Sequence, residues 1–165
     1  MSRVEVRRLQ PAEWAAYREV RRRALLDAPW AFGSTLAEAD RLSDADWRQR
    51  LSDRAIFVAT IGGLSVGLVA GIAAEAPKAA ELISMWVDPD WRGRGIGDQL
   101  VSTVIDWAAE HGFETIQLWV AEGNKEAERL YSRHGFRRTG ERQLMPSAAN
   151  RTEFAMIRQA GRVPD

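Results

Sequence analysis

Cysteine is absent from this 165-residue sequence, and so is any net charge, because 23 basic side chains balance 23 acidic ones. Without cysteine the chain has no disulfide bond, no cysteine-ligated zinc and no thiolate nucleophile. The balance of charge predicts no broad basic surface for nucleic acid or for an anionic membrane. Residues 1–10 lack the charged and then apolar pattern of a leader, so these absences together predict a cytoplasmic protein.

Internal repeats, low-complexity segments and interdomain linkers are likewise missing from the sequence. A chain of this length buries roughly 70% of the surface that its unfolded form exposes, which is enough for one sizeable hydrophobic core. We therefore expect a single domain over residues 1–165.

One stretch without a charged residue, at residues 55–74, has two interpretations. Its length and the four-residue spacing of three glycines suit a membrane-spanning helix with a close-packing face. Its centre, Gly62-Gly63, is instead a strong signal for a two-residue hairpin, and the flanks show no clear basic asymmetry. We favour the hairpin, with apolar strands near residues 55–61 and 64–74 inside a covered sheet. The spaced glycines are Gly63, Gly67 and Gly71.

Before that stretch, the sequence predicts one strand and a helical region. Residues 3–9 alternate apolar and charged side chains, which is typical of a half-buried strand. A helix follows from Pro11, with an apolar stripe at three- and four-residue steps and an arginine-rich outer face that we expect to be solvated. Two weaker helical patterns occupy residues 31–51. The stripe contains Trp14, Tyr17, Val20, Ala24 and Leu25, and the outer face contains Arg18, Arg21, Arg22 and Arg23.

After the hairpin, strands and helices alternate. Helices are expected at residues 97–111 and 124–133, the first of them ended by Gly112. A loop is expected at residues 145–151. The expected strands are residues 80–87, 115–120, 136–142 and 152–158.

The segment from Trp91 to Gly97, with the sequence Trp-Arg-Gly-Arg-Gly-Ile-Gly, joins the strand at 80–87 to the next helix. Glycine tolerates positive φ and lets a ligand approach the backbone closely. Alternating glycines before a helix N-terminus therefore leave several N–H groups directed at one anion. Arg92 and Arg94 add forked donors that suit phosphate oxygens. We interpret the segment as a pyrophosphate-binding loop; the alternative is a tight turn with solvated arginines.

Three nucleotide-binding motifs would explain the glycines. A P-loop needs Lys-Ser/Thr after its glycines, whereas this chain has Ile96-Gly97-Asp98. A dinucleotide fingerprint that starts at Gly93 needs a glycine where this chain has Asp98. The third motif, Gln/Arg-x-x-Gly-x-Gly/Ala after a strand, belongs to the coenzyme A site of the GNAT N-acetyltransferase superfamily. The segment from Arg92 to Gly97 resembles that motif at every defined position.

A second motif strengthens this resemblance. The family carries an Asn at the start of a later helix, an Ala three residues on, a Tyr four residues after that, and a closing Gly-Phe. Here these are Asn124, Ala127, Tyr131 and Gly135-Phe136. With the flanking strands the similarity covers about residues 55–158, so the first fifty residues, which such families vary to suit their acceptors, are the least informative.

The resemblance implies an α/β (α+β) fold whose central mixed, mostly antiparallel sheet has six to seven strands, is splayed in the middle and is flanked by about four helices. It also implies transfer of an acetyl group from acetyl-CoA to a primary amine, without a metal. Backbone groups of residues 85–87 would contact the pantetheine and thioester, and amides of residues 93–98 the pyrophosphate. The implied cofactor-binding residues are Met85, Trp86, Val87, Arg92, Gly93, Arg94, Gly95, Ile96, Gly97, Asp98 and Asn124.

Tyr131 is the expected general acid. It lies about two helical turns after Asn124 and therefore on the same helix face. Its phenol, with an ordinary pKa of about 10, is protonated at neutral pH and is able to protonate a leaving sulfur. The alternative for Tyr131 is an amphipathic core tyrosine, and Asn124 is a helix N-cap, a coenzyme contact or both.

Glu81 is the expected general base, at the position where histone-type members of the family place their catalytic glutamate. Ideal strand alternation would set Glu81 on one face with Ile83, Met85 and Val87, although a bulge would upset that parity. A solvated residue at a strand start is the alternative, and Glu122 is the nearest substitute base. The two histidines, His111 and His134, end helices and are assigned to no catalytic step.

The acceptor is not identified by the sequence, and small-molecule and peptide amines both remain open. A non-catalytic acyl-CoA-sensing module and a nucleic-acid-binding protein with a basic face are the rival classes, although we expect no nucleic acid and no membrane partner. The chain is expected to be a monomer or homodimer. Acidic residues that would receive a cationic amine, or cap helices instead, are Glu38, Asp40, Asp44 and Asp46. Aromatic residues that would line an acceptor pocket, or form core, are Trp30, Phe32 and Trp47.

Overall fold

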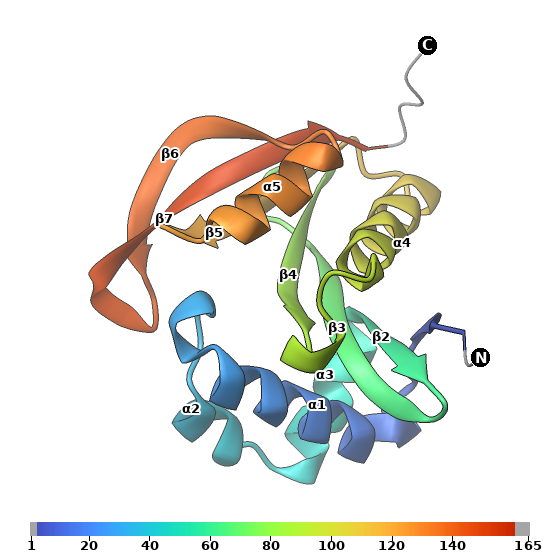
Figure 1. Cartoon of the computed structure of the whole chain (residues 1–165). Helices are drawn as coiled ribbons and strands as arrows, with labels where there is room; N and C mark the ends of the chain where they lie inside the picture. Colours follow the sequence, from blue (N-terminus) through green and yellow to red (C-terminus); the bar gives the residue numbers. More distant parts are fainter. Residues whose placement is uncertain (1–2, 161–165) are drawn as a thin grey trace.

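The computed structural model describes residues 3–160 and contains one seven-stranded sheet in the order β1-β2-β3-β4-β5-β7-β6 (Figure 1). All neighbouring strands are antiparallel except β4 and β5, which are parallel. The mixed, mostly antiparallel sheet implied by the family resemblance is therefore confirmed. The strands are β1 (Glu5–Arg8), β2 (Ala55–Ile61), β3 (Leu64–Ala73), β4 (Ala79–Val87), β5 (Thr115–Ala121), β6 (Arg137–Met145) and β7 (Ala148–Gln159).

Helices cover both faces of the sheet and form two cores. One core lies between the sheet and α4 with α5, and the other between the sheet and the N-terminal helices (Figure 1). The described residues contain five α-helices, one more than expected. They are α1 (Trp14–Asp27), α2 (Leu36–Asp40), α3 (Asp44–Asp53), α4 (Ile96–Glu110) and α5 (Lys125–Arg133), with short 3₁₀ turns η1 (Pro11–Glu13), η2 (Pro29–Ala31) and η3 (Pro89–Trp91).

The β6–β7 hairpin differs from the sequence expectation. Residues 145–151 do not form a loop, because β6 runs to Met145 and β7 begins at Ala148, so that Pro146 and Ser147 make a two-residue turn. Eight of the nine residues of β6 are exposed. A strand that packs on no core carries no apolar alternation, and the sequence pattern therefore could not reveal its length.

The uncharged stretch forms β2 and β3, and the predicted hairpin is confirmed. Gly62 and Gly63 occupy its turn with φ angles of +55° and +83°. Among residues 3–160, no helix combines the length and apolarity needed to cross a membrane. The other two glycines of the four-residue spacing, Gly67 and Gly71, allow α4 to pack closely on β3. A Cβ on Gly71 would lie 2.6 Å from the ring of Trp107, and one on Gly67 would lie 2.9 Å from Leu100.

The sheet opens between β4 and β5 (Figure 1). The two strands pair only through their first three positions, ending with Glu81 opposite Gln117. From there to Val87, β4 keeps β3 as a partner and has none on its β5 side. The splayed sheet implied by the family resemblance is thus present, and Glu81 stands at the point where the strands part.

A bulge in β4 changes which residues share a face. Its register with β3 shifts between Ile83 and Trp86, and Ser84 has a φ of +61°. Ile83 and Trp86 pack with the N-terminal helices, whereas Met85 and Val87 pack with α4. The expectation from ideal alternation, that Glu81 and Ile83 share a face with Met85 and Val87, is therefore wrong, because the extra residue reverses the parity.

The tight contact of α4 with β3 gives a stability prediction. Gly71→Ala should lower the free energy of unfolding by about 1–3 kcal/mol, because the added methyl group overlaps the ring of Trp107. Urea denaturation monitored by far-ultraviolet circular dichroism measures the change. Gly33→Ala is the control, since a Cβ there meets only Pro146 at an ordinary 3.8 Å. Equal stability of the two variants would contradict this packing.

Candidate functional site

The glycine loop, residues 92–95, connects β4 and the short turn η3 to the start of α4. Gly93 and Gly95 adopt φ angles of +78° and +81°, a region that residues with a Cβ rarely occupy, and Gly95 is the N-cap of α4. Amides in the first turn of a helix have no partner within the helix, and the helix dipole adds about half a positive charge there. The loop therefore has the positive-φ glycines and the helix N-terminus that the sequence predicted; anion binding there stays a prediction.

A cavity of about 580 Å³ adjoins this loop, bounded by β4, α5 and the chain after α1. Its walls include all of the cofactor-binding residues implied by the family resemblance except Arg94. Gly97 allows close packing at its wall, where a Cβ would lie 3.2 Å from Leu130 and 3.4 Å from Met85. Its walls include Asp27, Trp30, Phe32, Met85, Trp86, Val87, Arg92, Gly93, Gly95, Ile96, Gly97, Asp98, Asn124, Ala127, Leu130 and Arg133.

The two arginines of the loop have different surroundings. Arg92 donates to Asp27 at 2.7 Å and to the carbonyl of Val87 at 2.9 Å. Asp27 also accepts the indole N–H of Trp86 at 2.9 Å, so one carboxylate at the end of α1 holds both residues. The guanidinium of Arg94 lies over the ring of Trp91, 4.6 Å from its centre. Only Arg92 of this pair lines the cavity.

Asp98 links the first turn of α4 to the end of α5. It accepts hydrogen bonds from His134 at 2.8 Å and from Arg133 at 3.1 Å. Burial raises the pKa of Asp98, but these hydrogen bonds outweigh it and leave the pKa below its ordinary value. His134 closes α5 and His111 closes α4, as expected for the two histidines.

A second cavity, of about 490 Å³, lies where β4 and β5 have separated. It contains both expected catalytic residues, Glu81 and Tyr131, together with a group of arginines. Its walls include Arg21, Phe32, Ser34, Arg50, Arg54, Glu81, Met85, Trp119, Asn124, Tyr131, Gln143, Pro146 and Glu153. Six residues line both cavities, which therefore adjoin: Ala31, Phe32, Met85, Asn124, Ala127 and Leu130.

Tyr131 is 6% exposed and stacks edge-on against Phe136, with ring centroids 5.9 Å apart. Burial raises the pKa of its hydroxyl well above the ordinary value, so the group is neutral at any physiological pH. Asn124 caps α5 by accepting from the amide of Ala127 at 3.2 Å, and it also lines both cavities. The N-cap expectation for Asn124 is confirmed, and its side chain stands beside the space for a ligand.

Two carboxylates enter the second cavity from different strands. Glu81 accepts from Gln117 at 3.1 Å, across the last pair before the strands part. Glu153 on β7 is 7% exposed and accepts from Gln143 at 2.8 Å. Burial raises the pKa of Glu153, and the charge of Glu81 raises it further against the effect of Gln143. Sequence reasoning missed Glu153; its place among the apolar residues of β7 was the available signal.

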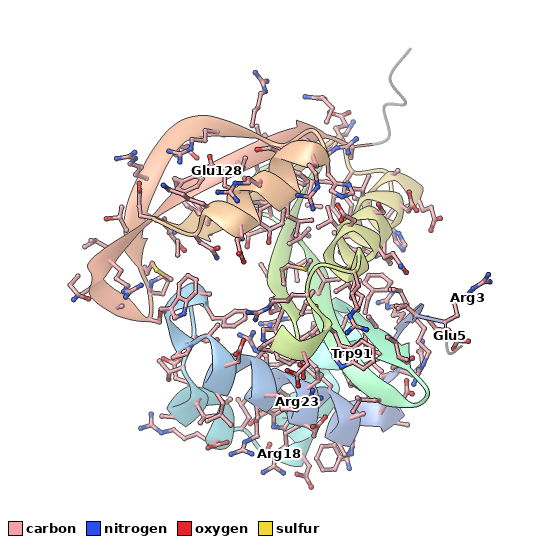
Figure 2. All side chains as sticks on the ribbon, viewed as in Figure 1. Arg3, Glu5, Arg18, Arg23, Trp91 and Glu128 are labelled. Carbon is pink, nitrogen blue, oxygen red and sulfur yellow. The ribbon has the colours of Figure 1, made fainter. Side chains whose placement is uncertain are left out.

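Arg21 corrects the expectation of a fully solvated arginine face on α1. It is 6% exposed, its Nη2 donates to Ser34 at 2.8 Å, and its guanidinium lies 4.8 Å from the centre of the Phe32 ring. Arg18 lies on the outer side of α1, as expected (Figure 2). Arg23 is half-buried and binds Asp88 at 2.6 Å. The face is therefore only partly solvated.

Among the other candidates from the sequence, Phe32 alone lines the second cavity. Glu122 pairs with Arg142 at 3.2 Å and lines neither cavity. The acidic residues proposed for the amine serve local structure: Glu38 and Asp46 complete capping boxes, Asp40 pairs with Arg22, and Asp44 lies in the first turn of α3. Of the three aromatic residues, Trp47 is fully buried core, Trp30 lines the first cavity and Phe32 lines both.

Comparison with known sequences identifies relatives of the chain. The family model for "Acetyltransferase (GNAT) family" matches residues 13–136. An uncharacterized N-acetyltransferase of Methanocaldococcus jannaschii is 37% identical over 95 residues, which are 54% of this chain and 42% of that protein. Two further curated relatives are also matched over less than two thirds of their length. The chain thus corresponds to only part of these proteins.

Solved structures share the whole fold. The acetyltransferase of the GNAT family from Streptococcus pneumoniae has a TM-score of 0.82 at 21% identity, over 96% of this chain and 100% of that one. A GNAT superfamily phosphinothricin acetyltransferase from Sinorhizobium meliloti, in complex with acetyl-CoA, has a TM-score of 0.78 at 20% identity, over 96% and 89%. These likenesses concern the fold, and the family match extends over most of the sequence. The chain therefore belongs to the GNAT acetyltransferase family.

Proposed function

We propose that the chain transfers an acetyl group from acetyl-CoA to a primary amine, by direct attack of the amine within a ternary complex. The observation that carries this proposal is the meeting of two cavities at the split between β4 and β5. One adjoins the glycine loop and the other holds two carboxylates and Tyr131, and they share six wall residues. Donor and acceptor bound in adjoining cavities would meet without a covalent enzyme intermediate.

The first cavity suits the donor. The positive-φ glycines and the N-terminus of α4 provide backbone N–H groups for a pyrophosphate, and Gly93 and Gly95 have open space above them. Residues 82–87 of β4 lack a β5 partner, so their free backbone groups are able to pair with the amides of pantetheine. Acetyl-CoA supplies the acetyl group as a thioester. We assign its binding to residues 85–87, residues 92–98 and Asn124.

Glu81 is proposed to accept the proton of the amine. An amine with a pKa of about 10.4 is only about one part in a thousand neutral at pH 7, which costs roughly 4–5 kcal/mol. Gln117 orients the Glu81 carboxylate at the edge of the second cavity. The carboxylate would take the proton as the amine nitrogen bonds to the carbonyl carbon. Glu153 faces the same cavity and is the second candidate for this role.

Tyr131 is proposed to protonate the sulfur as the carbon–sulfur bond breaks. Its raised pKa keeps the hydroxyl protonated, so that its proton is available to the sulfur as negative charge develops there. The proton count balances for the neutral amine, which loses one proton to a carboxylate while the sulfur gains one from the phenol. An amine that binds as an ammonium ion first releases its extra proton to solvent. Cytoplasmic location, a single domain over residues 1–165 and a monomeric or homodimeric state remain predictions.

An acceptor screen tests the proposed activity. Free thiol released from acetyl-CoA is measured with amino acids, polyamines, small amines and peptides with free N-termini. Turnover above the rate of spontaneous hydrolysis with any acceptor supports the proposal. Binding of acetyl-CoA without thiol release across the whole panel would instead identify a non-catalytic acyl-CoA sensor.

The glycine loop gives a prediction about donor binding. Gly95→Ala should weaken acetyl-CoA binding about 10-fold, because an added Cβ disfavours the φ of +81° by about 1–2 kcal/mol. Isothermal titration calorimetry measures the dissociation constant. Gly140→Ala is the matched control, since Gly140 has a φ of +96° and open space but lies on β6, away from both cavities. If both variants weakened binding equally, the loop would not be the anion site.

The phenol of Tyr131 gives a prediction about turnover. Tyr131→Phe should lower kcat about 100-fold or more, on the scale of general acid catalysis, while acetyl-CoA binding stays the same. The ring and its contact with Phe136 are retained, so the fold should be unaffected. Steady-state thiol release and calorimetry on the same preparation separate the two effects. Unchanged turnover would remove Tyr131 from the mechanism.

The raised pKa of Glu153 gives a prediction about stability and pH. An acid whose pKa is higher in the folded than in the unfolded state makes stability fall as pH rises from its ordinary 4.5 through the folded value. Glu153→Gln should remove this loss of stability with rising pH. The free energy of unfolding of the variant, compared with that of the wild type, should therefore be higher at pH 7 than at pH 4. Urea unfolding at both pH values measures the difference, with the exposed Glu141→Gln as control. A pH-independent difference would contradict the burial argument.

A further inference from the structure

The second cavity contains a buried positive charge, Arg21, that forms no ion pair within residues 3–160. Arg21 is 94% buried, and its Nη1 has no hydrogen-bond partner among the described residues. A buried donor of a charged group loses its hydrogen bonds to water, so leaving it unpaired is costly. Burial lowers the pKa of this guanidinium to about 10, so it remains charged at neutral pH. A native protein that retains such a group in a cavity has a donor available for a ligand.

Two further arginines surround the same position. Arg50 from α3 and Arg54 at its C-terminus line the cavity with Arg21, and their charges lower the pKa of Arg21 further. The ion pairs found within residues 3–160 involve none of the three. Three like charges that form no such ion pair repel one another, and an anionic group bound among them would relieve this repulsion.

The carboxylates of the cavity come from other elements. Glu81 belongs to β4 and Glu153 to β7, whereas the arginines belong to α1 and α3. The charge of Glu81 acts on Glu153 and raises its pKa. The cavity therefore has a positive group of residues for an anion and a negative group for a cation. A ligand that carries both charges would complement each group.

The turn between β6 and β7 limits the size of that ligand. The hydroxyl of Ser147 donates to the carbonyl of Phe32 at 2.6 Å, and Pro146 lines the cavity beside Gly33, where an added Cβ would lie 3.8 Å from the proline ring. This contact joins the hairpin to the chain after α1 and covers part of the cavity. About 490 Å³ remains, which is within the usual range for a small-molecule site.

We infer that the acceptor is a small amine that also carries a carboxylate, an amino acid in the chemical sense, with its carboxylate bound by Arg21, Arg50 and Arg54. Its ammonium group then lies toward Glu81 and Glu153, which is the arrangement that deprotonation of the amine requires. Arg21, as the buried member with a free donor, is the main contact, because a guanidinium binds a carboxylate through two parallel hydrogen bonds. This inference rests on the proposed acetyl transfer.

The test compares acceptors that differ only in the carboxylate. Thiol release from acetyl-CoA is measured with free L-amino acids, with their amides and with the corresponding decarboxylated amines. The free acids should have a kcat/KM at least 10-fold higher. Amides or simple amines that react as well as the acids, or a preference for acidic peptides over the free acids, would overturn the inference while leaving acetyl transfer intact.

Variants locate the contact. Arg21→Gln should raise KM for the preferred amino acid about 10- to 100-fold, the scale of a lost charged hydrogen bond, and should abolish its advantage over the amide. Because Arg21 is buried, Arg54→Gln provides a second, partly exposed site with a smaller expected rise. Arg18→Gln, on the outer side of the same helix, is the matched control. An acid preference that survives in both cavity variants would overturn the assignment.

A binding measurement keeps the two hypotheses distinguishable. With coenzyme A present, N-acetylated amino acids and their amides are titrated into the protein by calorimetry, which needs no turnover. Selective binding of the N-acetyl acids, lost in Arg21→Gln but kept in Arg18→Gln, supports the carboxylate site even if no acceptor is turned over. The carboxylate site would be contradicted if the N-acetyl acids showed no selective binding and the free amino acids no higher kcat/KM. Absence of turnover alone would contradict only the proposed function.

Discussion

The short pairing of β4 with β5 is the constraint on which the site depends. Only three positions pair before the strands part, and Glu81 with Gln117 is the last of them. Beyond that point, β4 pairs with β3 alone. The bulge at Ser84 turns Met85 and Val87 toward α4. Two adjoining cavities lie where the strands have separated. A continuous sheet would satisfy the backbone of β4 and leave no place for a donor to meet an acceptor.

The electrostatics of the two cavities differ, and each follows from its own elements. In the first, an anion would be held mainly by backbone amides at the start of α4, because Arg92 is already paired with Asp27. In the second, charged side chains dominate: Arg21 is buried with no partner for its Nη1 among residues 3–160, and Glu153 is buried near the charge of Glu81. Backbone recognition suits an invariable pyrophosphate, whereas side-chain charges are able to set the choice of acceptor.

Local sequence patterns predicted most of the residues singled out around the first cavity, and they missed Arg21 and Glu153 in the second. Gly93 and Gly95 adopt positive φ angles, and Asn124 caps a helix. These are local features, so a few residues of sequence are enough to predict them. Arg21 is buried because the chain after α1 folds over it, and Glu153 because β7 pairs with β5 beside the split. Such burial of charge depends on contacts between distant segments, as does the bulge that reversed the parity of β4.

Direct transfer between adjoining cavities is the central claim, and initial-rate kinetics with both substrates varied tests it most directly. If both substrates must be bound together, double-reciprocal plots at several fixed acceptor concentrations should give intersecting lines. The protein incubated with acetyl-CoA alone should also keep its mass. Parallel lines, together with a gain in mass of one acetyl group that is lost when the acceptor is added, would show a covalent intermediate and contradict the account.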